Sequence, residues 1–176
     1  ASQIECRILN WFAGQDDKVE EFRQNLDPYV GVASAFAGFT VNKVDHPELR
    51  QAGKVVELLC GFGGGGATIR RSLRVKAGIH ITPEEGEKYK VAYRSTHPFV
   101  ENLWKEGGRV ISRLAGGAPM DWGPVHIADG KMYLPNGTAI NYTTLEYYRD
   151  DEYDDSYWRM KTRRGWSKLY GAKLVE

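Results

Sequence analysis

Hydrophobic residues recur at helical spacing through the first two-thirds of the chain and gather into short alternating runs in the last third. Residues 2–12 predict a short extended stretch followed by a helix, and Asp16-Asp17 predict a second helix through Phe22. Prolines mark the stronger helix starts. The helices expected there run from Pro28, from Pro47 to about Phe62, from Pro83 to about His97 and from Phe99 to about Leu114.

Beyond Gly116-Gly117 the pattern changes to β-like runs at 125–127, 131–134 and 138–142. Asp129-Gly130 and Asn136-Gly137 separate these runs, and both dipeptides favour hairpin turns. Residues 149–165 are rich in charge and predict a solvated loop. The expected fold class is α+β, with a mostly helical segment followed by a small antiparallel β region.

The composition describes a globular chain of ordinary domain size. It has 176 residues, of which 41% are hydrophobic and 27% charged. The net charge of +1 provides no general attraction to nucleic acid, so DNA binding requires a local basic patch. Cys6 and Cys60 form no CxxC pair, which argues against a zinc ribbon and a disulfide framework. Because no signal peptide and no apolar run of membrane length is present, we expect a soluble, cytoplasmic protein.

One helical stripe carries the residues best suited to bind a nucleotide. Arg50, Lys54, Leu58 and Phe62 are spaced four apart, so they share one slowly drifting face. Two cations one turn apart can bind a triphosphate, and an aromatic side chain further along can pack on a base. The alternative is an ordinary solvated helix face.

Three segments resemble family A DNA polymerases of the phage type. Arg50-x3-Lys54-x6-Gly61-Phe62-Gly63 resembles motif B of that family, and Ser2-Gln3-Ile4-Glu5-x-Arg7 resembles motif A. Residues 168–176 resemble the lead-in to the helix that precedes motif C. The three segments occur in the family's order and bracket the whole chain, and both termini interrupt patterned segments. We therefore expect an excised piece of a larger polymerase.

The resemblance implies roles for individual residues. Arg50 and Lys54 would contact the β- and γ-phosphates of the incoming dNTP, and Tyr29 would border the triphosphate. Ser2, Gln3 and Glu5 would lie at the nucleotide, with Glu5 beneath its sugar, and Phe62 would pack near the nascent base pair. Leu58 stands where the family commonly has Phe or Tyr, and Phe62 where it usually has Tyr. Both departures bear on sugar discrimination.

The resemblance also implies two Mg²⁺ ions, whose aspartate ligands would lie outside this chain. The backbone carbonyl of Ala1 would be the one metal ligand within it, so we expect the isolated chain to be inactive. The implied partners are primer-template DNA, dNTP and the palm, thumb and any exonuclease parts of the parent enzyme. The implied regions are residues 1–26 at the palm edge, 27–115 as helical fingers and 116–176 as a β region leading back to the palm.

Further charged segments have two interpretations each. Gly63 and the basic cluster Arg70, Arg71, Arg74 and Lys76 are candidates for template backbone contacts, with a solvated face as the alternative. The cations between Trp158 and Lys168 favour a surface loop over a DNA contact, and the acidic run 150–155 favours a solvated loop over a metal site. A non-catalytic nucleotide- or DNA-binding module and a purely structural domain remain alternatives to a polymerase fragment.

Overall fold

The computed structural model describes residues 3–176, which divide into two compact units. The first unit ends at Asn102 and the second begins at Leu103. The first is helical, and the second combines helices with antiparallel sheets. The expected α+β class is therefore confirmed. None of the helices in the described residues combines the length and the apolar character that a membrane span requires.

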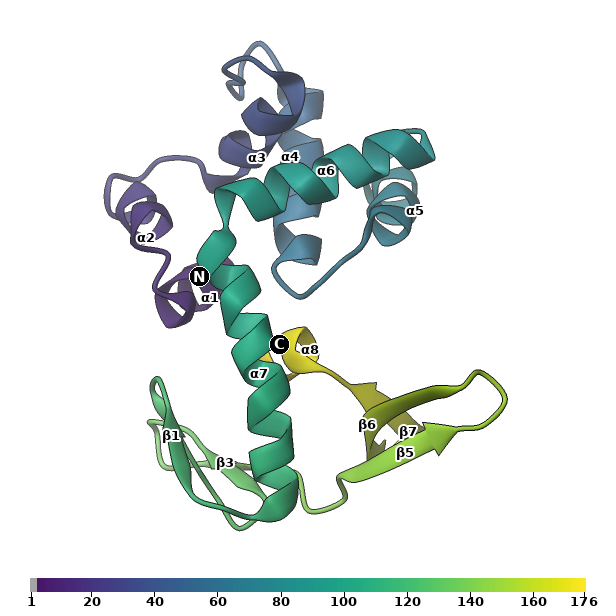
Figure 1. Cartoon of the computed structure of the whole chain (residues 1–176). Helices are drawn as coiled ribbons and strands as arrows, with labels where there is room; N and C mark the ends of the chain where they lie inside the picture. Colours follow the sequence, from purple (N-terminus) through teal and green to yellow (C-terminus); the bar gives the residue numbers. More distant parts are fainter. Residues whose placement is uncertain (1–2) are drawn as a thin grey trace. The chain divides into compact units, whose positions relative to one another are not determined.

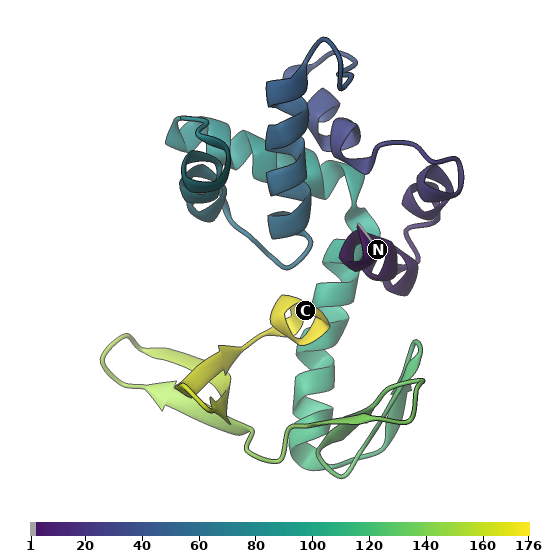
Figure 2. The same ribbon diagram turned by 180° about the vertical axis from the view of Figure 1, so that it is seen from behind.

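The first unit surrounds one central helix (Figures 1 and 2). That helix is α4 (Pro47–Cys60), and it packs against α3 (Pro28–Ala37), α5 (Gly66–Ala77), α6 (Pro83–Thr96) and α1 (Ile4–Ala13). The remaining helix of the unit, α2 (Asp16–Arg23), packs against α1 and α3. The core beneath these helices contains the fully buried rings of Tyr89 and Tyr93 together with aliphatic side chains, among them Val32, Val56, Ile69 and Leu73.

Local capping explains where these helices begin. Asp27 is the N-cap of α3, where its Oδ1 accepts a hydrogen bond of 3.1 Å from the backbone N–H of Tyr29. Thr82 and Glu85 form the predicted capping box at the start of α6. Their two reciprocal hydrogen bonds measure 3.2 Å and 2.8 Å. The helix starts predicted from proline and capping residues are confirmed.

The glycine run ends α4. The N–H of Gly64 donates to the carbonyl of Leu59, and the N–H of Gly63 donates to that of Cys60. This is the Schellman arrangement, which requires a left-handed residue just past the helix end. Gly63 supplies that conformation with φ +82°. The helix stops at the predicted glycines because those residues satisfy its last carbonyl groups.

The second unit contains the C-terminal part of α7 (Pro98–Gly116), two antiparallel sheets and α8 (Gly171–Val175). The first sheet has the order β1-β2-β3-β4 and the second the order β5-β6-β7. The strands of the first sheet are β1 (Met120–Trp122), β2 (Val125–Ala128), β3 (Lys131–Tyr133) and β4 (Ala139–Asn141). Those of the second are β5 (Glu146–Asp150), β6 (Asp155–Thr162) and β7 (Gly165–Leu169). Gly107 and Gly171 touch, which brings α8 against α7.

Two expectations about secondary structure were wrong. The segment 149–165 is not a loop, because β6 and parts of β5 and β7 occupy it. Aromatic residues face one another across these strands, and such cross-strand pairs stabilise a sheet despite the many charges. The short extended stretch expected at residues 2–12 is absent from the described residues there, since α1 already begins at Ile4.

Candidate nucleotide-binding site

Helices α3 and α4 meet at a glycine. A Cβ atom on Gly53 would overlap the backbone carbonyl oxygen of Tyr29, so only glycine permits this approach. The close contact places Tyr29 beside two α4 residues, Arg50 one turn before Gly53 and Lys54 directly after it. Tyr29 is 5% exposed, so its ring is a fixed surface for those neighbours.

Arg50 is held by two residues at the start of α3. Its Nε donates a hydrogen bond of 2.6 Å to Oδ2 of Asp27, and its guanidinium carbon lies 5.2 Å from the centre of the Tyr29 ring. The Arg50 side chain is 29% exposed. A guanidinium has five N–H donors, and the ion pair with Asp27 uses the one on Nε. The terminal nitrogens retain donors suited to a phosphate oxygen.

Lys54 lies on the other side of Gly53 and near the same ring. Its Nζ is 6.0 Å from the centre of the Tyr29 ring, within the outer range of a cation–π contact. Lys54 and Leu58 also line a hollow of about 230 Å³ between α4 and α5, together with Gln51, Val55, Leu59 and Lys76. Arg50 and Lys54 therefore present two cations at one place, and Lys76 adds a third at the hollow.

Gln3, in the segment that resembles motif A, lies near Tyr29. Burial raises the pKa of the Tyr29 hydroxyl, and the nearby Gln3 side chain opposes that shift in part. Gln3 and Tyr29 are 26 positions apart in sequence, so tertiary folding joins them. The predicted site residues Ala1 and Ser2 lie outside the described residues.

Two predicted nucleotide-binding residues, Glu5 and Phe62, make no polar or ring contact with Arg50 or Lys54 in the part of the chain that the structure describes. Glu5 is exposed on α1, and Phe62 is half-buried in the turn after α4. Among the contacts of residues 3–176, no hydrogen bond, ion pair or ring contact connects either one with Arg50 or Lys54. The assembled group is therefore Gln3, Tyr29, Arg50 and Lys54, with Leu58 at the adjoining hollow.

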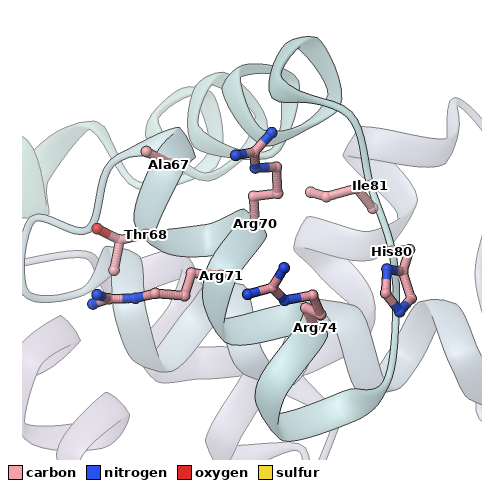
Figure 3. Close-up of a pocket in the computed structure, with 7 residues that line it drawn as sticks. All are labelled: Ala67, Thr68, Arg70, Arg71, Arg74, His80 and Ile81. Atoms are coloured by element: carbon pink, nitrogen blue, oxygen red, sulfur yellow. The ribbon is translucent and has the colours of Figure 1, made fainter.

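A basic surface follows on α5 (Figure 3). Arg70, Arg74 and His80 border a hollow of about 580 Å³, which is also lined by Ala67, Thr68, Arg71 and Ile81. Figure 3 shows Arg71 lying beside Thr68, away from Arg74 and His80. The three arginines are exposed, and no ion pair joins them to an acidic residue among those that the structure describes. Gly63 lies before this helix, in the turn that ends α4.

Glu57, on α4 one turn beyond Lys54, forms a buried polar pair with His97. Glu57 is 3% exposed and His97 is 2% exposed. His97 Nε2 lies 3.3 Å from Glu57 Oε1, close enough for an ion pair although it lacks the alignment of a hydrogen bond. The His97 ring stacks on Tyr93 with centroids 4.2 Å apart. This pair joins α4 to the junction between α6 and α7.

Sequence reasoning missed three residues of the site. Asp27 was recognised as a helix start, but its second carboxylate oxygen holds Arg50. Gly53 sets the distance between α3 and α4, and His80 borders the basic hollow beside α5. A glycine in the middle of a helix is costly, so its presence at position 53 was an available signal of close packing.

Metal-ligating side chains do not gather in clusters of three or more among the described residues. No group of three or more histidine, cysteine, aspartate or glutamate side chains among them could hold a metal ion. The acidic run 150–155 lies in and between β5 and β6, where Asp155 pairs with Lys168. Guanidinium and ammonium groups beside an aromatic ring, as at Arg50, Lys54 and Tyr29, are suited to binding anions.

Comparison with known proteins finds similarity to a DNA polymerase. No family model matches the chain. A DNA polymerase of Bacillus phage SP02 is 26% identical over 193 aligned positions, which cover 99% of this chain. The chain spans 28% of the length of that relative. This similarity supports a polymerase origin, and over nearly its whole length the chain is similar to part of a phage DNA polymerase.

Proposed function

We propose that this chain is the nucleotide-binding fingers segment of a family A DNA polymerase. It would bind the triphosphate of an incoming dNTP and contact the primer-template DNA for template-directed nucleotidyl transfer. The observation that carries the proposal is the meeting of Arg50, Lys54 and Tyr29. The motif resemblance assigns these three residues to the triphosphate, and they lie together around the contact between α3 and α4.

The geometry suits a polyphosphate. Arg50 retains donors beyond the one engaged by Asp27, and Lys54 brings a second cation to the same ring. The Tyr29 ring restricts both cations, so less side-chain freedom is lost when a ligand binds. Gln3 would contribute a polar side chain from the motif A segment, and Leu58 would border the sugar from the hollow beside Lys54.

The basic surface of α5 would bind the DNA. Arg70, Arg71 and Arg74 would contact backbone phosphates of the template without reading its sequence. The motif resemblance implies that the metal-binding carboxylates lie outside this chain, and the described residues hold no cluster of three or more ligating side chains. The proposal therefore assigns nucleotide and DNA binding to this chain and leaves the isolated chain without polymerase activity.

The test is an NMR titration of the chain with a dNTP and Mg²⁺. We expect shifts at α3 and α4, with binding weakened about tenfold or more in Arg50→Ala and in Lys54→Ala, since a hydrogen bond to a charged group contributes roughly 1.5–3 kcal/mol. Arg50→Lys keeps the charge but loses the forked donors, so it should restore only part of the affinity.

Lys43→Ala is the matched control, since Lys43 is an exposed cation outside α4. It removes the same charge and should leave the titration unchanged. Equal weakening by Lys43→Ala and Lys54→Ala would mean general charge attraction and would contradict a site on α4. Unchanged binding in both α4 variants would contradict the assigned residues directly.

A further inference from the structure

The second sheet carries a row of aromatic and cationic side chains on one face. The register pairs Arg159 with Lys168 and with Glu146, and pairs Lys161 with Trp166, so these residues share that face. Tyr148 and Tyr157 pair with each other two positions along the same strands. None of these residues belongs to the site on α4 or the basic surface of α5.

Cation–π contacts hold the side chains on this face in fixed positions. The Arg159 guanidinium lies 3.6 Å from the centre of the Tyr148 ring and 4.4 Å from that of Trp166. Its Nε also donates to Oε1 of Glu146 across 2.6 Å. Lys168 Nζ lies 4.2 Å from the centre of the Tyr157 ring. Arg159 thereby fixes the Trp166 ring, which remains 48% exposed.

Charge is distributed unevenly along the sheet. The acidic residues gather at the turn between β5 and β6, where Arg149 and Lys168 pair with three of them, Asp151, Asp154 and Asp155. The opposite end is the turn between β6 and β7, with Lys161 near the end of β6 and Arg163 and Arg164 in the turn itself. These three side chains are exposed, and none has an acidic partner among the described residues.

The turn that presents these cations is well defined. Thr162 Oγ1 accepts a hydrogen bond from the N–H of Arg164 and donates one to the carbonyl of Gly165, at 3.2 Å and 2.8 Å. Gly165 adopts φ +110°, a conformation that other residues rarely take. The basic end of the sheet is therefore a well-defined hairpin that includes the exposed and oriented Trp166.

We infer that this hairpin, residues 161–166, binds single-stranded DNA. Its three cations suit backbone phosphates, and the exposed Trp166 ring offers a platform on which a base can stack. Stacking requires an unpaired base, which favours a single strand over a duplex. The inference rests on the proposed function only in naming DNA as the nucleic acid, since the hairpin shares no residue with the α4 site.

The test is fluorescence anisotropy of the whole chain with a labelled 20-nucleotide single strand and, separately, its duplex. Replacing Lys161, Arg163 and Arg164 with Ala should weaken single-strand binding about tenfold or more and lower the salt slope by about 2, since each phosphate contact contributes roughly 0.7 to it. Trp166→Ala should weaken single-strand binding roughly fivefold or more, whereas Trp166→Phe should retain most of the affinity.

The matched control replaces Arg23, Lys43 and Lys88, which are exposed cations in the first unit. It lowers the net charge by the same amount and should have little effect. Equal losses in the control and hairpin variants, or a hairpin effect as large on duplex as on single strand, would overturn the inference. A hairpin variant without effect would overturn it even if Arg50→Ala weakens dNTP binding, in which case the proposed function stands alone.

Discussion

The carboxylate of Asp27 holds Arg50 through an ion pair of 2.6 Å, although the two residues are 23 positions apart in sequence. The same carboxylate caps α3 by accepting the N–H of Tyr29. One acidic side chain therefore stabilises the helix that carries the aromatic ring and orients the cation that lies over that ring. This double role makes Asp27 the positioning residue of the candidate site.

Two substitutions separate the roles of Asp27. Asn is also a good N-cap, so Asp27→Asn should keep the cap and lose the ion pair, whereas Asp27→Ala loses both. We expect Asp27→Ala to lower the free energy of unfolding by about 1 kcal/mol more than Asp27→Asn does. Urea denaturation measures the difference. Equal stability of the two variants would show that the cap contributes nothing.

Gly53→Ala should destabilise the chain despite the better helix propensity of alanine. The added Cβ would overlap the Tyr29 carbonyl, and overpacking of this kind costs about 1–3 kcal/mol. Gly31→Ala on α3 is the matched control, because its Cβ would lie 3.5 Å from Lys18 Nζ in ordinary contact. That variant should be stabilised by roughly 0.5–1 kcal/mol, and thermal unfolding of both would reveal opposite signs. Shifts of the same sign would refute the close α3–α4 contact.

Removing the Glu57 side chain from its contact with His97 should lower the free energy of unfolding. Both side chains are almost fully buried, so removing the carboxylate in Glu57→Ala leaves a buried imidazole without its partner and opens a cavity. We expect a loss of roughly 1–3 kcal/mol from the buried imidazole left unpaired, measured by urea denaturation. The exposed Glu48 on the same helix is the control, and Glu48→Ala should cost less than about 1 kcal/mol. Similar costs for the two variants would contradict the role of the buried pair.

The buried thiols predict a loss of stability in alkali. Burial, with nearby Glu57 adding to it, raises the pKa of Cys6 and of Cys60 from 9.0 to about 12. The folded chain therefore keeps thiol protons that the unfolded chain releases. The contribution of the thiols to the free energy of unfolding is complete below pH 9 and is lost as the pH rises towards 12. Each thiol should steepen the decline by about 1.4 kcal/mol per pH unit in that window.

Cys60→Ala tests this pH dependence. The variant should be less stable at pH 7, because it loses a buried side chain, and its free energy of unfolding should fall less steeply between pH 9 and 12. Urea denaturation at several pH values in that range gives both slopes. Parallel slopes in the parent chain and the variant would exclude the Cys60 thiol as a source of the alkaline sensitivity.

Local signals predicted the helical part well because the interactions responsible are local. The Thr82–Glu85 capping box and the Asp27 cap each join residues two or three positions apart, so the sequence pattern contains the whole interaction. The second sheet was missed for the opposite reason. Its strands are held by pairs such as Tyr148 with Tyr157 and Tyr147 with Trp158, and charge density hid this alternation in the sequence.

The sequence by itself determined the helix starts, the glycine end of α4 and the choice of Arg50 and Lys54 as candidate ligands. Only the tertiary structure decided which residues meet them, because Asp27 and Tyr29 come from the start of another helix, α3. A hydrophobic pattern specifies which face of a helix is buried but not which partner covers it. Gly53 selects that partner through a contact that exists only once α3 and α4 have packed together.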